Sequence, residues 1–73
     1  MDKYTICLFA FRYLQNHTTI DELVLQEFIK ERDTTGKIIP IKNIQLALKE
    51  MYQKGKISFV FSDETRTIYS LAL

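Results

Sequence analysis

The chain has 73 residues, 47% of them hydrophobic, and a formal net charge of +1 at pH 7. This length allows one domain, covering residues 1–73, and the apolar content, with only two Gly and one Pro, excludes a disordered or fibrous chain. One Cys and one His exclude an internal disulfide and the usual zinc-ligand sets.

Residues 4–16 are predicted to form a first helix, with Asp2 placed to cap its N-terminus. The apolar run within it, residues 4–14, contains Arg12 and is well short of the roughly 20 residues that a membrane helix needs. No small-residue cleavage site of a signal peptide follows it. We therefore expect a soluble, intracellular protein, cytoplasmic or nucleoid-associated, with no membrane partner.

A short β-prone segment, residues 18–20, precedes a predicted second helix over residues 21–32. Thr19 and Glu22 fit the S/T-x-x-E capping box that opens such a helix. The apolar stripe of this helix consists of Val24, Leu25, Phe28 and Ile29. The side chains predicted to face water are Gln26, Glu27, Lys30 and Glu31. A turn over residues 33–36 follows, in which Gly36 can adopt positive φ.

Residues 37–39 are expected to be a short extended piece, after which Pro40 fits the first turn of a third helix over residues 41–54. Gly55 is placed to end that helix. Its predicted inward side consists of Ile41, Ile44, Ala47, Leu48, Met51 and Tyr52, all at helical spacing.

After Gly55 the period of the apolar pattern changes from 3.6 to 2 residues. Residues 57–62 and 67–71 are rich in β-branched and aromatic side chains and predict two strands. The polar connector 63–66 lets them pair as a hairpin. The predicted fold class is therefore α+β, in the order helix, short strand, helix, turn, helix, hairpin.

That order resembles the winged helix-turn-helix superfamily of DNA-binding domains. The segment ALKEMYQKGKI, residues 47–57, resembles the passage "LxxLxxxGxI" that leads from the third helix of that superfamily into its wing. The resemblance implies a three-helix winged helix-turn-helix with a C-terminal β-hairpin wing. It also implies a third helix that enters the major groove of double-stranded DNA and a wing that touches the backbone or the minor groove.

The DNA-binding residues that the resemblance implies lie mostly on the exposed side of the third helix. They are Lys42, Asn43, Gln45, Leu46, Lys49 and Gln53, with Thr35 and Lys37 before the helix and Arg66 in the wing. Lysines can neutralise phosphates or bind guanine, and Asn and Gln can pair with adenine. The charge distribution agrees, since residues 1–34 carry four basic and six acidic side chains (net −2) and residues 35–73 carry six and three (net +3).

Two features depart from the DNA-binding pattern. Asp63 and Glu64 would place carboxylates at the wing tip, where a phosphate backbone would repel them. The connection over residues 33–40 is longer than a tight helix-turn-helix allows. Both features weigh against the DNA-binding interpretation, and the acidic tip weighs in particular against contact between the wing and DNA.

The first helix has more apolar surface than a small core covers. Leu8, Phe9 and Tyr13 lie beyond the half of the helix that the rest of the domain shields. Either the C-terminal residues 71–73 fold back over these side chains, or they form a dimer or partner interface. We expect the interface, in a homodimer that suits a two-fold symmetric DNA site.

The first functional hypothesis is a small DNA-binding protein that regulates transcription as a homodimer. The alternative is a protein–protein interaction adaptor that uses the winged-helix fold without DNA, through Leu46 and the first helix, or an obligate subunit whose first helix completes another protein's core. No Gly-rich phosphate loop, nucleophile elbow or metal-ligand spacing is present in the sequence. We therefore predict no enzymatic activity and no cofactor.

Overall fold

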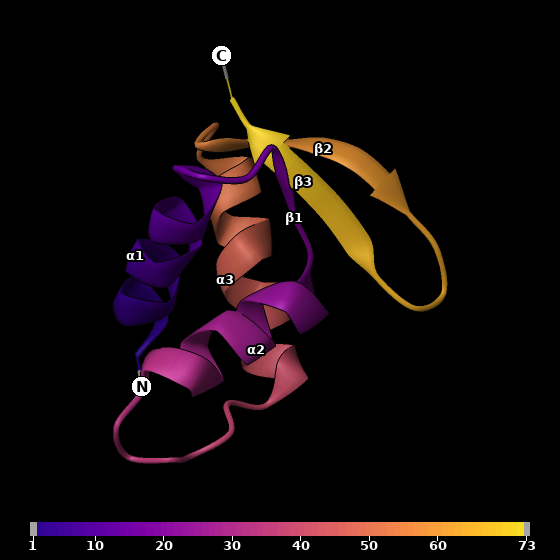
Figure 1. Ribbon diagram of the computed structural model, residues 1–73. Coiled ribbons are helices and arrows are strands. Elements are labelled where there is room, and N and C mark those ends of the chain that lie inside the picture. The colour runs from indigo at the N-terminus through magenta and orange to yellow at the C-terminus, as the bar shows by residue number, and fades with distance from the viewer. Residues whose placement is uncertain (1, 73) are drawn as a thin grey trace.

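The structure, a computed structural model, describes residues 2–72 and is an α+β fold of three helices and a three-stranded antiparallel sheet. The elements in chain order are α1 (Lys3–Leu14), β1 (Thr19–Ile20), α2 (Glu22–Arg32), α3 (Ile41–Gln53), β2 (Ile57–Ser62) and β3 (Thr67–Leu71). The three helices pack together, and the β2–β3 hairpin projects beyond them (Figure 1). This arrangement is compatible with a winged helix layout and confirms the predicted order of elements.

The core lies where the three helices meet the inner face of the sheet. Each helix contributes side chains at helical spacing, because residues three and four apart lie on one side of a helix. The buried hydrophobic residues are Ile6, Ala10, Leu14, Ile20, Leu25, Ile29, Ile39, Ile44, Ala47, Leu48, Met51, Ile57 and Tyr69. The predicted inward side of α3 is thus confirmed except at Ile41, which is partly buried, and Tyr52.

Tyr52 is 47% exposed and does not enter the core. Its ring lies over the sheet, 5.9 Å from the ring of Tyr69. Tyr52 was predicted to face inward, and this is wrong because it lies at the edge of the apolar side of α3. There the neighbouring hairpin covers only one side of its ring. Gly55 adopts φ 75° just beyond the end of α3, as its predicted role in ending the helix requires.

In the sheet, β3 is central and β1 and β2 are its two edges. Ile20 of β1 pairs with Tyr69, and Phe59 of β2 pairs with the same tyrosine from the other side, so these three side chains share the inner face. A β-bulge between Phe59 and Phe61 shifts the register, and Phe61 then pairs with Ile68.

The predicted capping box at the start of α2 is wrong. Asp21 is the N-cap, and its Oδ1 accepts a hydrogen bond of 2.8 Å from the backbone N–H of Val24. Thr19 lies instead in β1, paired with Ser70. Pairing with β3 fixes the backbone of Thr19 in the sheet, two residues too early to cap the helix.

Glu22, the other residue of that motif, is almost completely buried. Its Oε1 accepts a hydrogen bond of 2.6 Å from the backbone N–H of Thr67, at the start of β3. The carboxylate therefore joins α2 to the hairpin, 45 residues later in the chain, and does not close a local cap.

The connection between α2 and α3 contains the predicted turn, with Gly36 at φ 71°, and residues 37–39, predicted as a short extended piece, are not part of the sheet. Gln26 was expected to face water, and this is wrong. Its Nε2 donates a hydrogen bond of 2.8 Å to the backbone oxygen of Ile39, whose side chain is buried. Because a buried backbone oxygen needs a donor, this amide replaces the sheet partner that the segment lacks.

Three aspartates hold local turns and caps with their carboxylates. The pKa of Asp2 is lowered mainly by the backbone N–H of Thr5, which donates to it at the start of α1. The pKa of Asp33 is lowered mainly by the hydroxyl of Thr35. In the hairpin turn, the hydroxyl of Thr65 is the main cause of the lowered pKa of Asp63.

We expect these aspartates to make the protein sensitive to acid. A carboxyl group whose pKa is lower in the folded state stabilises the fold above its ordinary value of 3.8, and this stabilisation is lost as the pH falls through the lowered pKa. The melting temperature should hold down to about pH 5 and fall below about pH 4. The Asp2→Asn/Asp33→Asn/Asp63→Asn variant keeps a hydrogen-bond acceptor at each site but cannot be protonated there. Its melting temperature, followed by circular dichroism, should therefore fall less at acid pH. The same fall in the variant and the unmodified protein would contradict the role of these aspartates.

Candidate nucleic-acid interface

The side of α3 away from the core forms the candidate interface, called here the outward face of α3. Its members are Lys42, Asn43, Gln45, Leu46, Lys49 and Gln53, and each is exposed. Opposite them, Ile44, Ala47, Leu48 and Met51 fix the helix against the core. The exposure predicted for this face is therefore confirmed, and within residues 2–72 no segment folds over it.

The outward face carries two lysines that are available for an anion. Within residues 2–72, no carboxylate lies within 4.0 Å of the ammonium group of Lys42 or Lys49. Seven residues apart, they stand on the same side of the helix about 10 Å from each other along its axis. Polar amides of Asn43, Gln45 and Gln53 surround them. Such a surface offers both phosphate contacts and donor–acceptor pairs for base edges.

Glu50, beside the outward face, would oppose an anionic partner if its charge were free. Its Oε1 lies 3.0 Å from the Nζ of Lys3 and 3.8 Å from the Nζ of Lys54. The hydrogen bond from Lys3 is the main reason why the pKa of Glu50 is lowered. The carboxylate therefore stays ionised and is neutralised by two ammonium groups. The Lys3 contact could not be predicted from the sequence, because that residue is 47 positions away.

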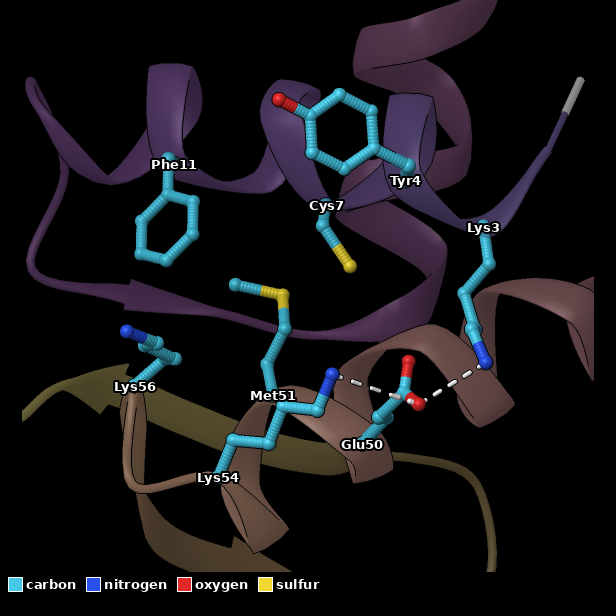
Figure 2. A pocket seen from close by; sticks show the side chains of 8 residues that line it. All are labelled: Lys3, Tyr4, Cys7, Phe11, Glu50, Met51, Lys54 and Lys56. Carbon is cyan, nitrogen blue, oxygen red and sulfur yellow. Dashed lines mark hydrogen bonds and ion pairs between the residues drawn. The ribbon is translucent and has the colours of Figure 1, made fainter.

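These same residues line a groove between α1 and the end of α3 (Figure 2). The groove has a volume of about 380 Å³. It is lined by Lys3, Tyr4, Cys7, Phe11, Glu50, Met51, Lys54 and Lys56. Cys7 faces it, and its Sγ lies 4.0 Å from the backbone oxygen of Ala47. Burial raises the pKa of this thiol, so it is protonated at neutral pH. The spacing of Tyr4, Cys7 and Phe11 on one side of a helix was the only signal of the groove in the sequence.

The flanking residues implied by the superfamily resemblance are less free than the outward face. The hydroxyl of Thr35 donates a hydrogen bond of 2.6 Å to Asp33 Oδ2 within the turn before α3. The side chain of Lys37 is exposed. Arg66 lies 3.6 Å from Asp21 at the N-terminus of α2. This contact ties Arg66, the predicted DNA-binding residue of the wing, to α2, and its contact with DNA stays a prediction.

The predicted dimer interface on α1 is mostly covered by α2. The rings of Phe9 and Tyr13 pack edge-to-face against Phe28, with centroids 6.2 Å and 5.2 Å away. Both residues are half-buried, and Leu8 remains 48% exposed. Among the described residues, the cover is therefore α2 and not the C-terminal strand. The explanation by residues 71–73 therefore named the wrong element, and residue 73 lies outside the described residues. The dimer or partner interface stays a prediction, with Leu8 as its most exposed member.

Three further exposed apolar residues follow one another along β2. Phe59, Val60 and Phe61 are 51%, 49% and 49% exposed. The alternating pattern predicted these residues only as a strand and did not predict their exposure. A signal was present, because three consecutive apolar residues break the alternation of a strand with one buried face.

Comparison with known protein families, with curated proteins and with solved structures finds no significant match to this chain. Among residues 2–72, no three His, Cys, Asp or Glu side chains are grouped closely enough to hold a metal ion. None of the helices described is long and apolar enough to span a membrane. The outward face of α3 is therefore judged on its own geometry and charge.

Proposed function

We propose that this chain is a small DNA-binding protein of the winged helix-turn-helix type, which regulates transcription by placing α3 in the major groove. The outward face of α3 carries the proposal. It is exposed along the helix, it is polar, and its two lysines have no ion-pair partner among residues 2–72. An α-helix of this kind fits the width of the major groove.

The shape of the rest of the molecule supports the same mode of binding. The core holds α3 on its far side, so the outward face projects from the domain. The carboxylate nearest to it, Glu50, is neutralised by Lys3 and Lys54. Lys42 and Lys49 contact phosphates in this proposal, and Asn43, Gln45 and Leu46 meet base edges. The hairpin tip, with Asp63 and Glu64, stays away from the DNA.

A titration of labelled duplex DNA at several salt concentrations tests this proposal. Affinity should fall as salt rises, because bound lysines release counterions from the phosphates. The Lys42→Gln/Lys49→Gln variant should bind more weakly, and the slope of log affinity against log salt should shrink by about 2, close to one unit for each lost phosphate contact. Fluorescence anisotropy measures both quantities.

The matched control removes the same net charge from α1 and α2. The Arg12→Gln/Lys30→Gln variant alters two exposed cations outside the outward face. It should keep the salt slope of the unmodified protein. Equal loss in both variants would show non-specific attraction only, and no affinity at low salt would end the DNA-binding proposal.

A protein–protein adaptor is the second candidate, and Leu46 is the observation that favours it. This side chain is 53% exposed in the middle of the outward face. It lines a hollow of about 190 Å³ with Lys3, Ile6 and Asn43. An apolar side chain beside such a hollow suits a protein contact as well as a thymine methyl group. Binding to a protein partner that survives high salt, together with indifference to DNA, would favour the adaptor.

A further inference from the structure

The outer edge of the sheet is open at β2. Within residues 2–72, β2 pairs only with β3, and β3 is the centre of the sheet (Figure 1). Of the six residues of β2, only Ile57 is buried. Edge strands present unpaired backbone N–H and C=O groups that can pair with another strand, and proteins usually protect them with charges or prolines. The sequence of β2, ISFVFS, contains neither.

The bulge gives β2 an internal symmetry. Pairing with β3 places Ile57, Phe59 and Ser62 on the inner face, and Ser58 and Phe61 on the outer face. Val60 is the extra residue of the bulge. At equal distances from the point between Phe59 and Val60, residues 57 and 62 therefore share the inner face, and residues 58 and 61 share the outer face.

This symmetry matters for pairing with a second copy. A twofold axis perpendicular to the sheet keeps the inner side chains of both copies on the same face. Each residue of β2 must therefore stand opposite a residue of the second copy's β2 that lies on the same face. If the axis passes between Phe59 and Val60, Ile57 stands opposite Ser62 of the second copy, and Ser58 opposite Phe61. Both pairs satisfy the condition. A regular strand without the bulge would fail in this register.

The charges at the ends of β2 fit the same register. Lys56 precedes the strand and Asp63 follows it, and the antiparallel pairing places the lysine of each copy opposite the aspartate of the other. Within residues 2–72, no carboxylate lies within 4.0 Å of the Lys56 ammonium group. At the axis, Phe59 of each copy meets Val60 of the other, and both are half-exposed in the single chain.

From these observations we infer that two copies of this chain associate through antiparallel pairing of their β2 edges, in the register that sets Lys56 opposite Asp63. Bulges ordinarily hinder pairing at an edge because they interrupt the hydrogen-bond ladder. Here both bulges meet at the twofold axis, and the segments on either side remain free to pair. The acidic hairpin tip, which is unsuited to DNA, is suited to the lysine of a second copy.

The dimer joins the two sheets into one six-stranded sheet with both sets of helices on the same side. Each sheet supplies three strands, and the perpendicular axis preserves the face on which the helices pack. The association needs no DNA, so it is tested separately from the proposed function. It also differs from the α1 interface expected from the sequence, because Leu8 takes no part in it.

Analytical ultracentrifugation over a range from about 10 μM to about 1 mM tests the association without DNA. The unmodified chain should shift from monomer to dimer. Val60→Lys places a charge opposite Phe59 of the second copy and should weaken the dimer by about tenfold or more. The matched control Leu8→Lys, on the exposed side of α1, should leave the dimer unchanged. A monomer at every concentration, or dimer loss caused by Leu8→Lys alone, would overturn the inference.

Cysteine trapping tests the register, even where Val60→Lys fails to fold. In a Cys7→Ala background, Ser58→Cys and Phe61→Cys are made in separate chains and mixed under mild oxidation. The mixture should form a disulfide-linked dimer much faster than either chain alone, because position 58 stands opposite position 61 of the other copy and not opposite itself. Faster trapping of either chain alone, or equally slow trapping in all three samples, would refute this pairing.

Discussion

Replacing Glu22 with alanine is expected to lower the free energy of unfolding by about 1–3 kcal/mol, the cost of leaving a buried group without its partner. The Glu22 carboxylate is 2% exposed and accepts the backbone N–H of Thr67 at 2.6 Å. Its loss removes this hydrogen bond between α2 and β3. Urea denaturation followed by circular dichroism measures the change.

The neighbouring Thr19→Ala variant is the control for this assignment. If Thr19 and Glu22 formed a capping box, both substitutions would cost similar amounts. In the structure Thr19 is an exposed residue of β1, so its replacement should cost less than about 0.5 kcal/mol. Asp21→Ala, which removes the true N-cap, should cost about 1 kcal/mol. Equal costs for Thr19→Ala and Glu22→Ala would restore the local cap and contradict the bond to β3.

Replacing Leu48 with alanine is expected to have the largest effect on stability, a loss of about 2–5 kcal/mol. Leu48 is fully buried at the centre of the core, where α3 meets the other helices. Truncation loses the transfer free energy of the removed methyl groups and leaves a cavity that the packed neighbours fill only in part. Because native domains are stable by only about 5–15 kcal/mol, this variant should be partly unfolded at moderate temperature.

Leu46, two residues earlier on the same helix, provides the matched comparison. It is 53% exposed, so Leu46→Ala should change stability by no more than about 0.5 kcal/mol. The same substitution should weaken DNA binding, by about 1 kcal/mol or more if Leu46 meets a thymine methyl group. A Leu46→Ala variant that is destabilised as strongly as Leu48→Ala would show that the outward face of α3 is not free.

Local patterns in the sequence correctly predicted the order of the elements. The change from a helical to an alternating period after Gly55 located both strands of the hairpin to the residue. Asp2 was correctly identified as the cap of α1. These predictions succeeded because helix spacing, strand alternation and the positive φ of a terminating glycine depend on neighbours only a few residues away.

The outward face of α3 was also predictable, for a related reason. A helix with a continuous apolar side must turn that side inward, and the remaining positions then face outward. Lys42, Leu46 and Lys49 could therefore be placed before any coordinates were known.

By itself, then, the sequence determined the three helices, the hairpin and the polar side of α3, since each follows from periodicity along one segment. Only the tertiary structure decided that Glu22 serves β3, that Phe28 covers Phe9 and Tyr13, and that β2 is an open edge. Those outcomes depend on which segments, tens of residues apart in the chain, come into contact. The burial of whole helix and sheet faces decides these contacts, and the propensity of any one residue does not.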